Sequence, residues 1–272
     1  MDNASATTAS RGPIPVASSP RTPGDSEPRQ EVPGLQIGTF IDLHKALVIP
    51  VILALMWYYH NGSTDAFVYL GMHGSYSLLW LVKQRTYRDV RFDQRVHPLA
   101  GILFIFLPLA GYYVAPYLLI SRHITVPPAL VGLSVFVFTF GVFLHFVSDA
   151  QKFYTLQLRK GLIREGLFSR MRNPNYLGEI LIYLGYATMS MHWLPFLILA
   201  GWVFGFFVRN MLAKDRSLAR NPGFEDYRKS SGLLFPRLFS DLQARALTSY
   251  RCAPPPIVRA SADKVGACAM TC

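Results

Sequence analysis

Polar residues recur at helical spacing in an apolar stretch near residue 180: Asn175, Glu179, Tyr183 and Tyr186. Intervals of four, four and three residues place them on one face of a helix. A carboxylate inside an apolar helix is costly in lipid and indicates a functional site. Glu179 and Tyr183 are therefore candidate catalytic residues. The alternative is a structural ion pair between Glu179 and Arg172 or Arg209.

The dipeptide Asn173-Pro174 precedes this stripe and predicts a helix start. An asparagine side chain can accept a hydrogen bond from a free backbone amide, and proline is well tolerated at the first helical position. We expect the helix to begin at Pro174 with Asn173 as its cap. The polar stripe then lies within the first turns of this helix.

A second polar group ends the preceding apolar run and includes His145, Ser148, Asp149, Lys152, Arg159 and Lys160. Asp149 and Arg159 can position the ribose and phosphates of a nucleotide, because guanidinium groups bind phosphate through two hydrogen bonds. Basic residues beside a bilayer can equally bind anionic lipid head groups. Charge alone leaves both interpretations open.

The composition indicates that a membrane surrounds these residues. Of the 272 residues, 51% are hydrophobic and only 16% are charged, whereas a soluble domain carries about 25% charged residues. The formal net charge is +11, but the basic residues lie in short segments between apolar runs, which argues against a nucleic-acid partner. The sequence lacks the GxGxxG, GxxxxGK[ST], HExxH and GxSxG signatures.

Six apolar runs predict an all-α, polytopic membrane bundle, since a span needs roughly 20 residues. They cover residues 44–59, 66–82, 98–120, 125–147, 176–191 and 193–212. The last two runs are expected to form a tight C-terminal helical hairpin. Gly201 and Gly205 have the GxxxG spacing that lets helices approach closely in lipid.

The distribution of basic residues predicts the orientation in the membrane. Seventeen Lys and Arg residues lie in the segments 83–95, 152–172 and 214–237, and only Arg122 lies in the opposite set of loops. This predicts that both termini are cytosolic, in the endoplasmic reticulum of a eukaryote or the inner membrane of a bacterium. The chemistry is expected to face the cytosol.

The chain divides into four predicted parts: a disordered cytosolic tail over 1–36, four membrane helices over 37–147, a C-terminal domain over 148–238 and a disordered tail over 239–272. The tails are polar and rich in small residues, a composition that does not support a packed core. All three cysteines lie in the last 21 residues, and the histidines lack HxxxH spacing. The sequence therefore predicts no metal site.

Residues of about 140–238 resemble the C-terminal domain of the steroid 5α-reductase superfamily. The matching residues are Ser148-Asp149, Gly161, Gly166-Leu167-Phe168, Asn173-Pro174-Asn175-Tyr176-Leu177-Gly178-Glu179 and Phe224-Glu225-Asp226-Tyr227. The resemblance implies an NADPH-dependent membrane reductase that saturates an activated C=C in a lipid or sterol-like substrate. In similar reductases, the residue matching Asn175 contacts the nicotinamide carboxamide, and the residue matching Glu179 faces the substrate or cofactor ring. The predicted cofactor-binding residues are Asp149, Arg159, Arg172, Asn175 and Tyr227.

Two other functions stay open. More distant relatives of the superfamily include isoprenylcysteine carboxyl methyltransferases, whose R-x-P-x-Y-x-G pattern is satisfied by Arg172, Pro174, Tyr176 and Gly178. This allows an S-adenosylmethionine-dependent isoprenylcysteine or lipid methyltransferase. Steroid reductases usually carry a His pair after the last helix, where this chain has Lys214-Asp215, so a non-enzymatic sterol-binding or scaffold protein is a third possibility. In the implied reductase, a protein acid would polarise the conjugated carbonyl of the substrate, and no motif marks this residue. Because a tyrosine hydroxyl can serve as such an acid, the candidates are Tyr69, Tyr76, Tyr112 and Tyr113.

Overall fold

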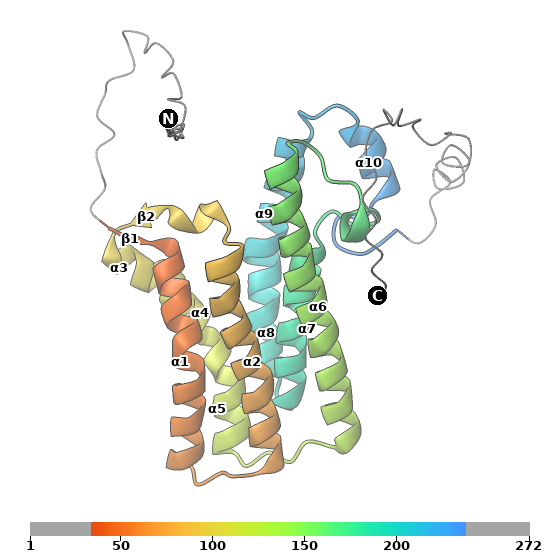
Figure 1. Ribbon diagram of the computed structural model, residues 1–272. Coiled ribbons are helices and arrows are strands. Elements are labelled where there is room, and N and C mark those ends of the chain that lie inside the picture. Colours follow the sequence, from red (N-terminus) through yellow and green to blue (C-terminus); the bar gives the residue numbers. More distant parts are fainter. Residues whose placement is uncertain (1–33, 238–272) are drawn as a thin grey trace, which may run out of the picture.

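The computed structural model describes residues 34–237, which form a helical bundle with one small β-pair (Figure 1). The predicted tails lie outside the described residues except for residues 34–36, of which positions 35 and 36 form a strand. This strand, β1 (Leu35–Gln36), pairs antiparallel with β2 (Arg95–Val96). The three cysteines also lie outside the described residues.

The first half of the bundle contains α1 (Ile37–Tyr58), α2 (Thr64–Thr86) and the 3-10 turn η1 (Val90–Asp93). A continuous but irregular helical path follows, made of α3 (Pro98–Gly101), the π-helix η2 (Ile102–Phe106), α4 (Leu107–Ala110), η3 (Gly111–Tyr113) and α5 (Val114–Ser121). Pro108 and Pro116 lie within this path. Because proline lacks a backbone donor, regular i to i−4 bonding is interrupted there.

The second half begins with the long helix α6 (Pro128–Leu158) and the turn η4 (Gly166–Phe168). It continues through α7 (Pro174–Met189), α8 (Trp193–Trp202), the π-helix η5 (Val203–Phe207), α9 (Val208–Leu218) and α10 (Phe224–Ser230). Helix α6 passes without a break through the predicted domain boundary at 147/148. The two halves therefore share one helix and are not separate at this boundary.

The expectation of an all-α membrane bundle is confirmed in its coarse form. Four helical segments in the described part of the chain are long and apolar enough to cross a membrane: Ile37–Tyr58, Pro98–Ser121, Pro128–Leu158 and Trp193–Leu218. The other two predicted spans differ from these. Helix α7 has only 16 residues, and α2 carries Asp65, Lys83 and Arg85.

Helices α6 and α7 form the closest helix pair, and Gly141, Gly178 and Gly185 allow this approach. A Cβ at position 141 would lie 2.7 Å from the carbonyl oxygen of Gly178. The prediction that Gly201 and Gly205 provide a close helix contact is wrong, since a Cβ at either position would meet no atom within 4 Å. Helix α7 therefore packs mainly on α6, and its hairpin partner α8 contributes less.

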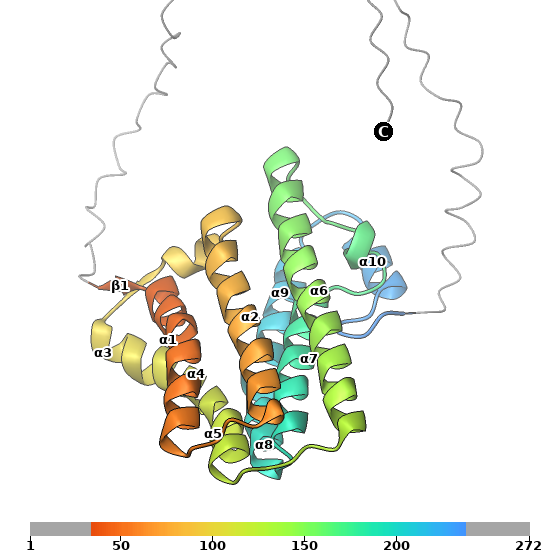
Figure 2. The same ribbon diagram turned by 60° about the horizontal axis from the view of Figure 1, so that its bottom comes forward.

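The connections 59–63, 122–127 and 190–192 lie at one end of the bundle, and the remaining connections lie at the other (Figure 1). Seen from the first end, α2 lies between α1 and the pair of α6 and α7 (Figure 2). The strand β1 and helix α10 lie at the opposite end, which also holds the basic segments. The two ends of the described chain thus share one side of the bundle.

Candidate functional site

A cavity of about 410 Å³ lies among α1, α2, α6 and α7, and is completed by η1 and by residues of the segments 104–112 and 202–210. This volume is within the range of small-molecule sites. Four of the seven predicted site residues line it: Asp149, Asn175, Glu179 and Tyr183. The i, i+4 spacing on α7 therefore placed three side chains on one cavity wall. Tyr186 continues the stripe beyond the cavity, where its ring stacks on His73 with centroids 4.4 Å apart.

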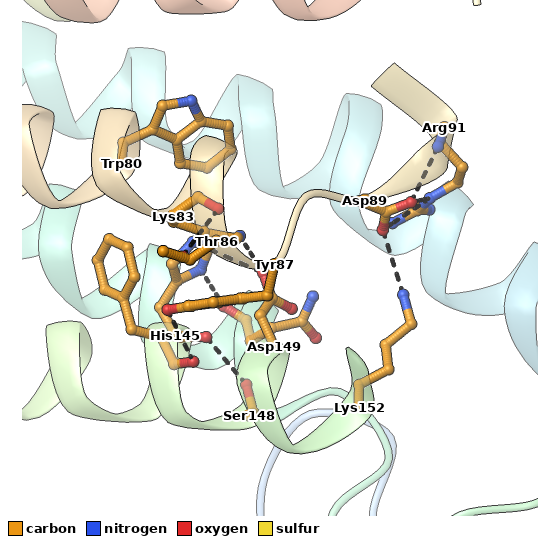
Figure 3. Close-up of polar contacts among 12 residues, drawn as sticks. Trp80, Lys83, Thr86, Tyr87, Asp89, Arg91, His145, Ser148, Asp149 and Lys152 are labelled. Atoms are coloured by element: carbon orange, nitrogen blue, oxygen red, sulfur yellow. Dashed lines mark hydrogen bonds and ion pairs between the residues drawn. The ribbon is translucent and has the colours of Figure 1, made fainter. Parts of the chain in front are cut away.

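The buried ion pair of Lys83 and Asp149 joins α2 to α6 at the cavity (Figure 3). The Lys83 side chain is only 3% exposed. It was predicted as a loop residue that reports topology, but it lies inside the last turn of α2 and points at a carboxylate. Lys83 is thus a site residue as well as a member of the basic segment 83–95.

His145 completes this group. Its Nδ1 donates to the backbone carbonyl of Asn175 at 3.2 Å, and its Nε2 lies 3.9 Å from Oδ2 of Asp149. Its ring stacks on Trp80 with an interplanar angle of 22°. The bond to Asn175 ties α6 to the first turn of α7, so His145 positions the start of the polar stripe.

A charged rim lies at the polar end of the cavity and is formed by Asp89, Arg91 and Lys152 (Figure 3). The Nη2 of Arg91 lies 2.8 Å from Oδ2 of Asp89, and Nζ of Lys152 lies 3.2 Å from the same oxygen. Partial burial opposes ionisation of Asp89, but the hydrogen bonds from Arg91 and the charge of Lys152 hold the pKa of this carboxyl below its usual value. Asp89 and Arg91 both line the cavity.

Aromatic rings surround the deeper part of the cavity. The ring of Tyr183 stacks on Tyr112 with centroids 3.7 Å apart and an interplanar angle of 4°. Nζ of Lys45 donates to the hydroxyl oxygen of Tyr183 at 3.3 Å and lies 4.3 Å from the centroid of Tyr76. Trp80 also lines the cavity and donates from Nε1 to Asp42 at 3.2 Å. The interior therefore combines apolar walls with a buried ammonium and a phenol.

Asn175 and Glu179 present polar groups to the cavity. Within the described part of the chain, neither side chain has a hydrogen bond or ion pair. The expected alternative, a structural ion pair of Glu179 with Arg172 or Arg209, is therefore wrong. Both groups are available to a molecule bound in the cavity.

Three predicted cofactor residues are not brought to the cavity: Arg159, Arg172 and Tyr227. Arg159 pairs with Glu165 in an exposed loop. The hydroxyl of Tyr227 donates to the carbonyl of Phe168 at 2.7 Å, and burial raises its pKa. These residues fix the loops at the end of the bundle.

Arg172 holds the segment before α7 against the C-terminal elements. Its Nη2 lies 2.9 Å from Asp215 of α9, and its Nη1 donates to the carbonyl of Ser231 at 2.6 Å. Helix α7 begins at Pro174 as predicted, but the side chain of Asn173, at the N-cap position, does not make the expected capping bond. The side chain of Asn173 is engaged elsewhere. It donates to the carbonyl of Leu233 at 2.9 Å and accepts from Lys214 at 3.0 Å. Arg172 and Asn173 therefore anchor the start of α7 both to α9 and to the chain that follows α10.

Several cavity residues were not singled out from the sequence, among them Lys45, Trp80, Lys83, Asp89 and Arg91. A signal existed for Lys45, because it is a charged residue within the apolar run 44–59, and such residues mark functional sites. Tyr76 and Tyr112 line the cavity, as two of the four tyrosine candidates. Tyr69 lies in the core, and Tyr113 instead donates to the carbonyl of His44 at 3.0 Å.

The helices and this cavity define a class: a polytopic helical membrane protein with a partly charged internal pocket. The chain belongs to the family described as protein of unknown function DUF1295, which matches residues 71–230. The match runs from α2 to α10 and includes both carboxylates Asp149 and Glu179. A segment of 58 residues is also 41% identical to an uncharacterized protein of Schizosaccharomyces pombe. That alignment covers 21% of this chain and 19% of the length of the yeast protein.

Proposed function

We propose that this protein is an NADPH-dependent membrane reductase that saturates an activated C=C in a lipid or sterol-like substrate. The observation that carries the proposal is the shared cavity of Asn175, Glu179 and Tyr183, with charged groups at one end and aromatic walls at the other. A dinucleotide needs cations for phosphate, and a lipid needs an apolar chamber. A cavity that offers both cations and apolar walls suits a reaction between a dinucleotide and a lipid.

The residues present fit this cofactor. The carboxamide of Asn175 offers a donor and an acceptor, which complement the nicotinamide carboxamide. Arg91 and Lys152 at the rim supply positive charge for phosphate, and Asp149 can accept from a ribose hydroxyl. Reduced nicotinamide, when bound, supplies a hydride. Arg159, Arg172 and Tyr227 leave the proposed cofactor set because neither they nor their hydrogen-bond and ion-pair partners line the cavity.

The protein's own groups then orient and shield the reaction. Glu179 lies one turn from Asn175 on α7 and therefore borders both the cofactor and the substrate. Tyr112 and Tyr183 form a flat aromatic wall. A dry site of this kind strengthens the interaction of fixed donors with charge that develops on a substrate oxygen.

We also propose that all six helical segments cross the membrane with both termini in the cytosol. The basic segments 83–95, 152–172 and 214–237 share one end of the bundle, and an excess of basic residues favours the cytosolic side. The charged rim lies at this end. NADPH would thus reach the cavity from the cytosol, and a lipid would reach it from the bilayer.

The test is the thermal stability of the purified protein in detergent with NADPH or with S-adenosylmethionine. A ligand at 100 times its dissociation constant adds about 2.7 kcal/mol, so NADPH is expected to raise the melting temperature clearly. Stabilisation by S-adenosylmethionine alone would replace the reductase by the methyltransferase. Stabilisation by neither would favour the sterol-binding or scaffold function. The pattern shared with methyltransferases has a packing explanation here, since Arg172 binds Asp215 and Gly178 lies against α6.

A further inference from the structure

The carboxylate of Asp89 is bound by two cationic side chains and by the backbone (Figure 3). Nη2 of Arg91 lies 2.8 Å from Oδ2, and Nε of the same guanidinium lies 3.1 Å from Oδ1. The backbone nitrogen of Arg91 donates to Oδ1 at 3.0 Å, and Nζ of Lys152 donates to Oδ2 at 3.2 Å. Both carboxylate oxygens therefore have donors, and the guanidinium binds them as a fork.

The same donors would suit a phosphate group. A guanidinium fork, an ammonium and a backbone N–H bind phosphate oxygens as well as they bind carboxylate oxygens. Asp89 and Arg91 line the cavity, so this cluster borders the space that a ligand would fill. The carboxylate of Asp89 thus occupies the position that an anionic ligand would take.

The exposure of these side chains allows one anion to replace another. The side chain of Arg91 is 59% exposed, that of Lys152 is 35% exposed and that of Asp89 is 20% exposed. Ion pairs with this exposure add little to stability, because water solvates both partners. A phosphate can therefore replace the carboxylate at the two cations while Asp89 turns toward water, and the helices need not move.

The local backbone needs an acceptor at position 89 but not a charge. Asp89 is the N-cap residue of η1, and its side chain accepts from the backbone nitrogen of Arg91. Asparagine and serine cap about as well as aspartate. Capping therefore accounts for an oxygen at this position, whereas the negative charge of Asp89 acts on Arg91 and Lys152.

We propose that Asp89 fills the phosphate site of the ligand-free protein, and that a phosphate group of the cofactor binds by displacing this carboxylate from Arg91 and Lys152. This inference rests on the proposed NADPH-dependent function and adds a built-in competitor to the cofactor site. Such a competitor lowers the observed affinity in proportion to the fraction of molecules whose site is free. Free phosphate is thereby disfavoured, whereas a dinucleotide that also fills the cavity can displace Asp89.

The test measures the affinity of inorganic pyrophosphate for the full chain in a non-ionic detergent at low salt, by isothermal titration calorimetry. Pyrophosphate carries no nicotinamide, so its binding does not depend on the redox function. We expect Asp89→Asn to bind pyrophosphate about 5- to 30-fold more tightly than wild type, because it frees both cations and removes a like charge. The double variant Asp89→Asn/Arg91→Gln should lose this gain.

Asp93→Asn is the matched control. Asp93 belongs to the same turn η1 and pairs with Arg88 at 2.6 Å, but it does not line the cavity. This substitution changes the net charge equally and should alter pyrophosphate affinity less than twofold. If Asp89→Asn fails to fold, Asp89→Ser makes the same comparison with a side chain that also caps. Equal affinities of the position 89 and position 93 variants, or an undiminished gain in the double variant, would overturn the proposal.

NADPH affinity, measured separately by fluorescence, distinguishes this proposal from the reductase itself. We expect Asp89→Asn to bind NADPH more tightly than wild type by a similar factor. A protein that binds NADPH, but whose affinities for NADPH and pyrophosphate are unchanged by Asp89→Asn, would contradict the competitor role and leave the reductase standing. Tighter pyrophosphate binding by Asp89→Asn without NADPH binding by either form would support the displacement of Asp89 by phosphate and contradict the reductase.

Discussion

Gly178 lies so near to His145 that a Cβ at position 178 would be 2.5 Å from the backbone nitrogen of His145. His145 lines the cavity, and Gly178 directly precedes the cavity residue Glu179 on α7. Backbone atoms cannot give way as a flexible side chain can, so the approach of the two helices depends on this glycine.

We predict that Gly178→Ala lowers the free energy of unfolding by several kcal/mol, because overpacking typically costs 1–3 kcal/mol and here a backbone must move. Gly201→Ala is the matched control. A Cβ at position 201 would meet no atom within 4 Å, so this change should be close to neutral. Thermal unfolding of both variants in detergent is the measurement, and equal effects would contradict the described packing of α6 and α7.

The pair of Lys83 and Asp149 gives a second prediction. Asp149→Leu leaves a buried ammonium without its partner, at a cost of about 3–5 kcal/mol. The double variant Lys83→Met/Asp149→Leu should recover most of this loss, because it removes both charges. Unfolding free energies of wild type, both single variants and the double variant complete the cycle. Additive losses in the double variant would show that the two side chains do not interact.

Tyr227 was predicted to bind the cofactor, but its hydroxyl donates to Phe168. Tyr227→Phe removes this donor and leaves a buried carbonyl unsatisfied, which costs about 1–3 kcal/mol. We therefore expect a lower melting temperature and unchanged NADPH affinity. The measurement is a binding titration at a temperature where the variant is fully folded. A weakened affinity there would restore the cofactor role of Tyr227.

The ion pairs of Asp89 in the charged rim predict that the stability of the folded protein depends on pH. The pKa of Asp89 is lowered in the folded protein, so its contribution to stability is fully present above the unfolded pKa of about 3.9 and is lost as the pH falls toward the folded value. Arg91 is 59% exposed, and solvent screening limits the contribution to about 1 kcal/mol or less. Asp89→Asn should therefore be less stable than wild type at pH 6, and the difference should shrink below pH 4. A difference that is constant down to pH 3 would contradict the rim pairing.

Local patterns predicted the parts of the site that depend on one helix. The i, i+4 spacing of Asn175, Glu179 and Tyr183 was sufficient because helical geometry alone places them on one face. The contact of Lys45 with Tyr183 joins residues 138 positions apart, and it depends on how α1 packs, which no local pattern encodes.

Arg172 and Lys83 differ from their predicted surroundings for one physical reason. Arg172 stands beside the polar stripe in sequence, and Lys83 stands in a basic run, so charge and position suggested a cofactor ligand and a loop residue. Each side chain instead turns toward a carboxylate on another helix, Asp215 or Asp149. The direction of a long side chain depends on its tertiary partner. Likewise, the spacing of Gly201 and Gly205 permits a close helix contact but does not supply the opposing helix.

The most direct test of the central claim is the dissociation constant of NADPH for wild type and Asn175→Ala, with Tyr227→Phe as a control at matched folded fraction. Loss of the Asn175 carboxamide should leave its cofactor partners unsatisfied at a cost of about 1–3 kcal/mol, or roughly 5- to 150-fold in affinity. We expect this loss for Asn175→Ala alone. Equal NADPH affinity in wild type and Asn175→Ala would contradict the account of the cavity as a nicotinamide site.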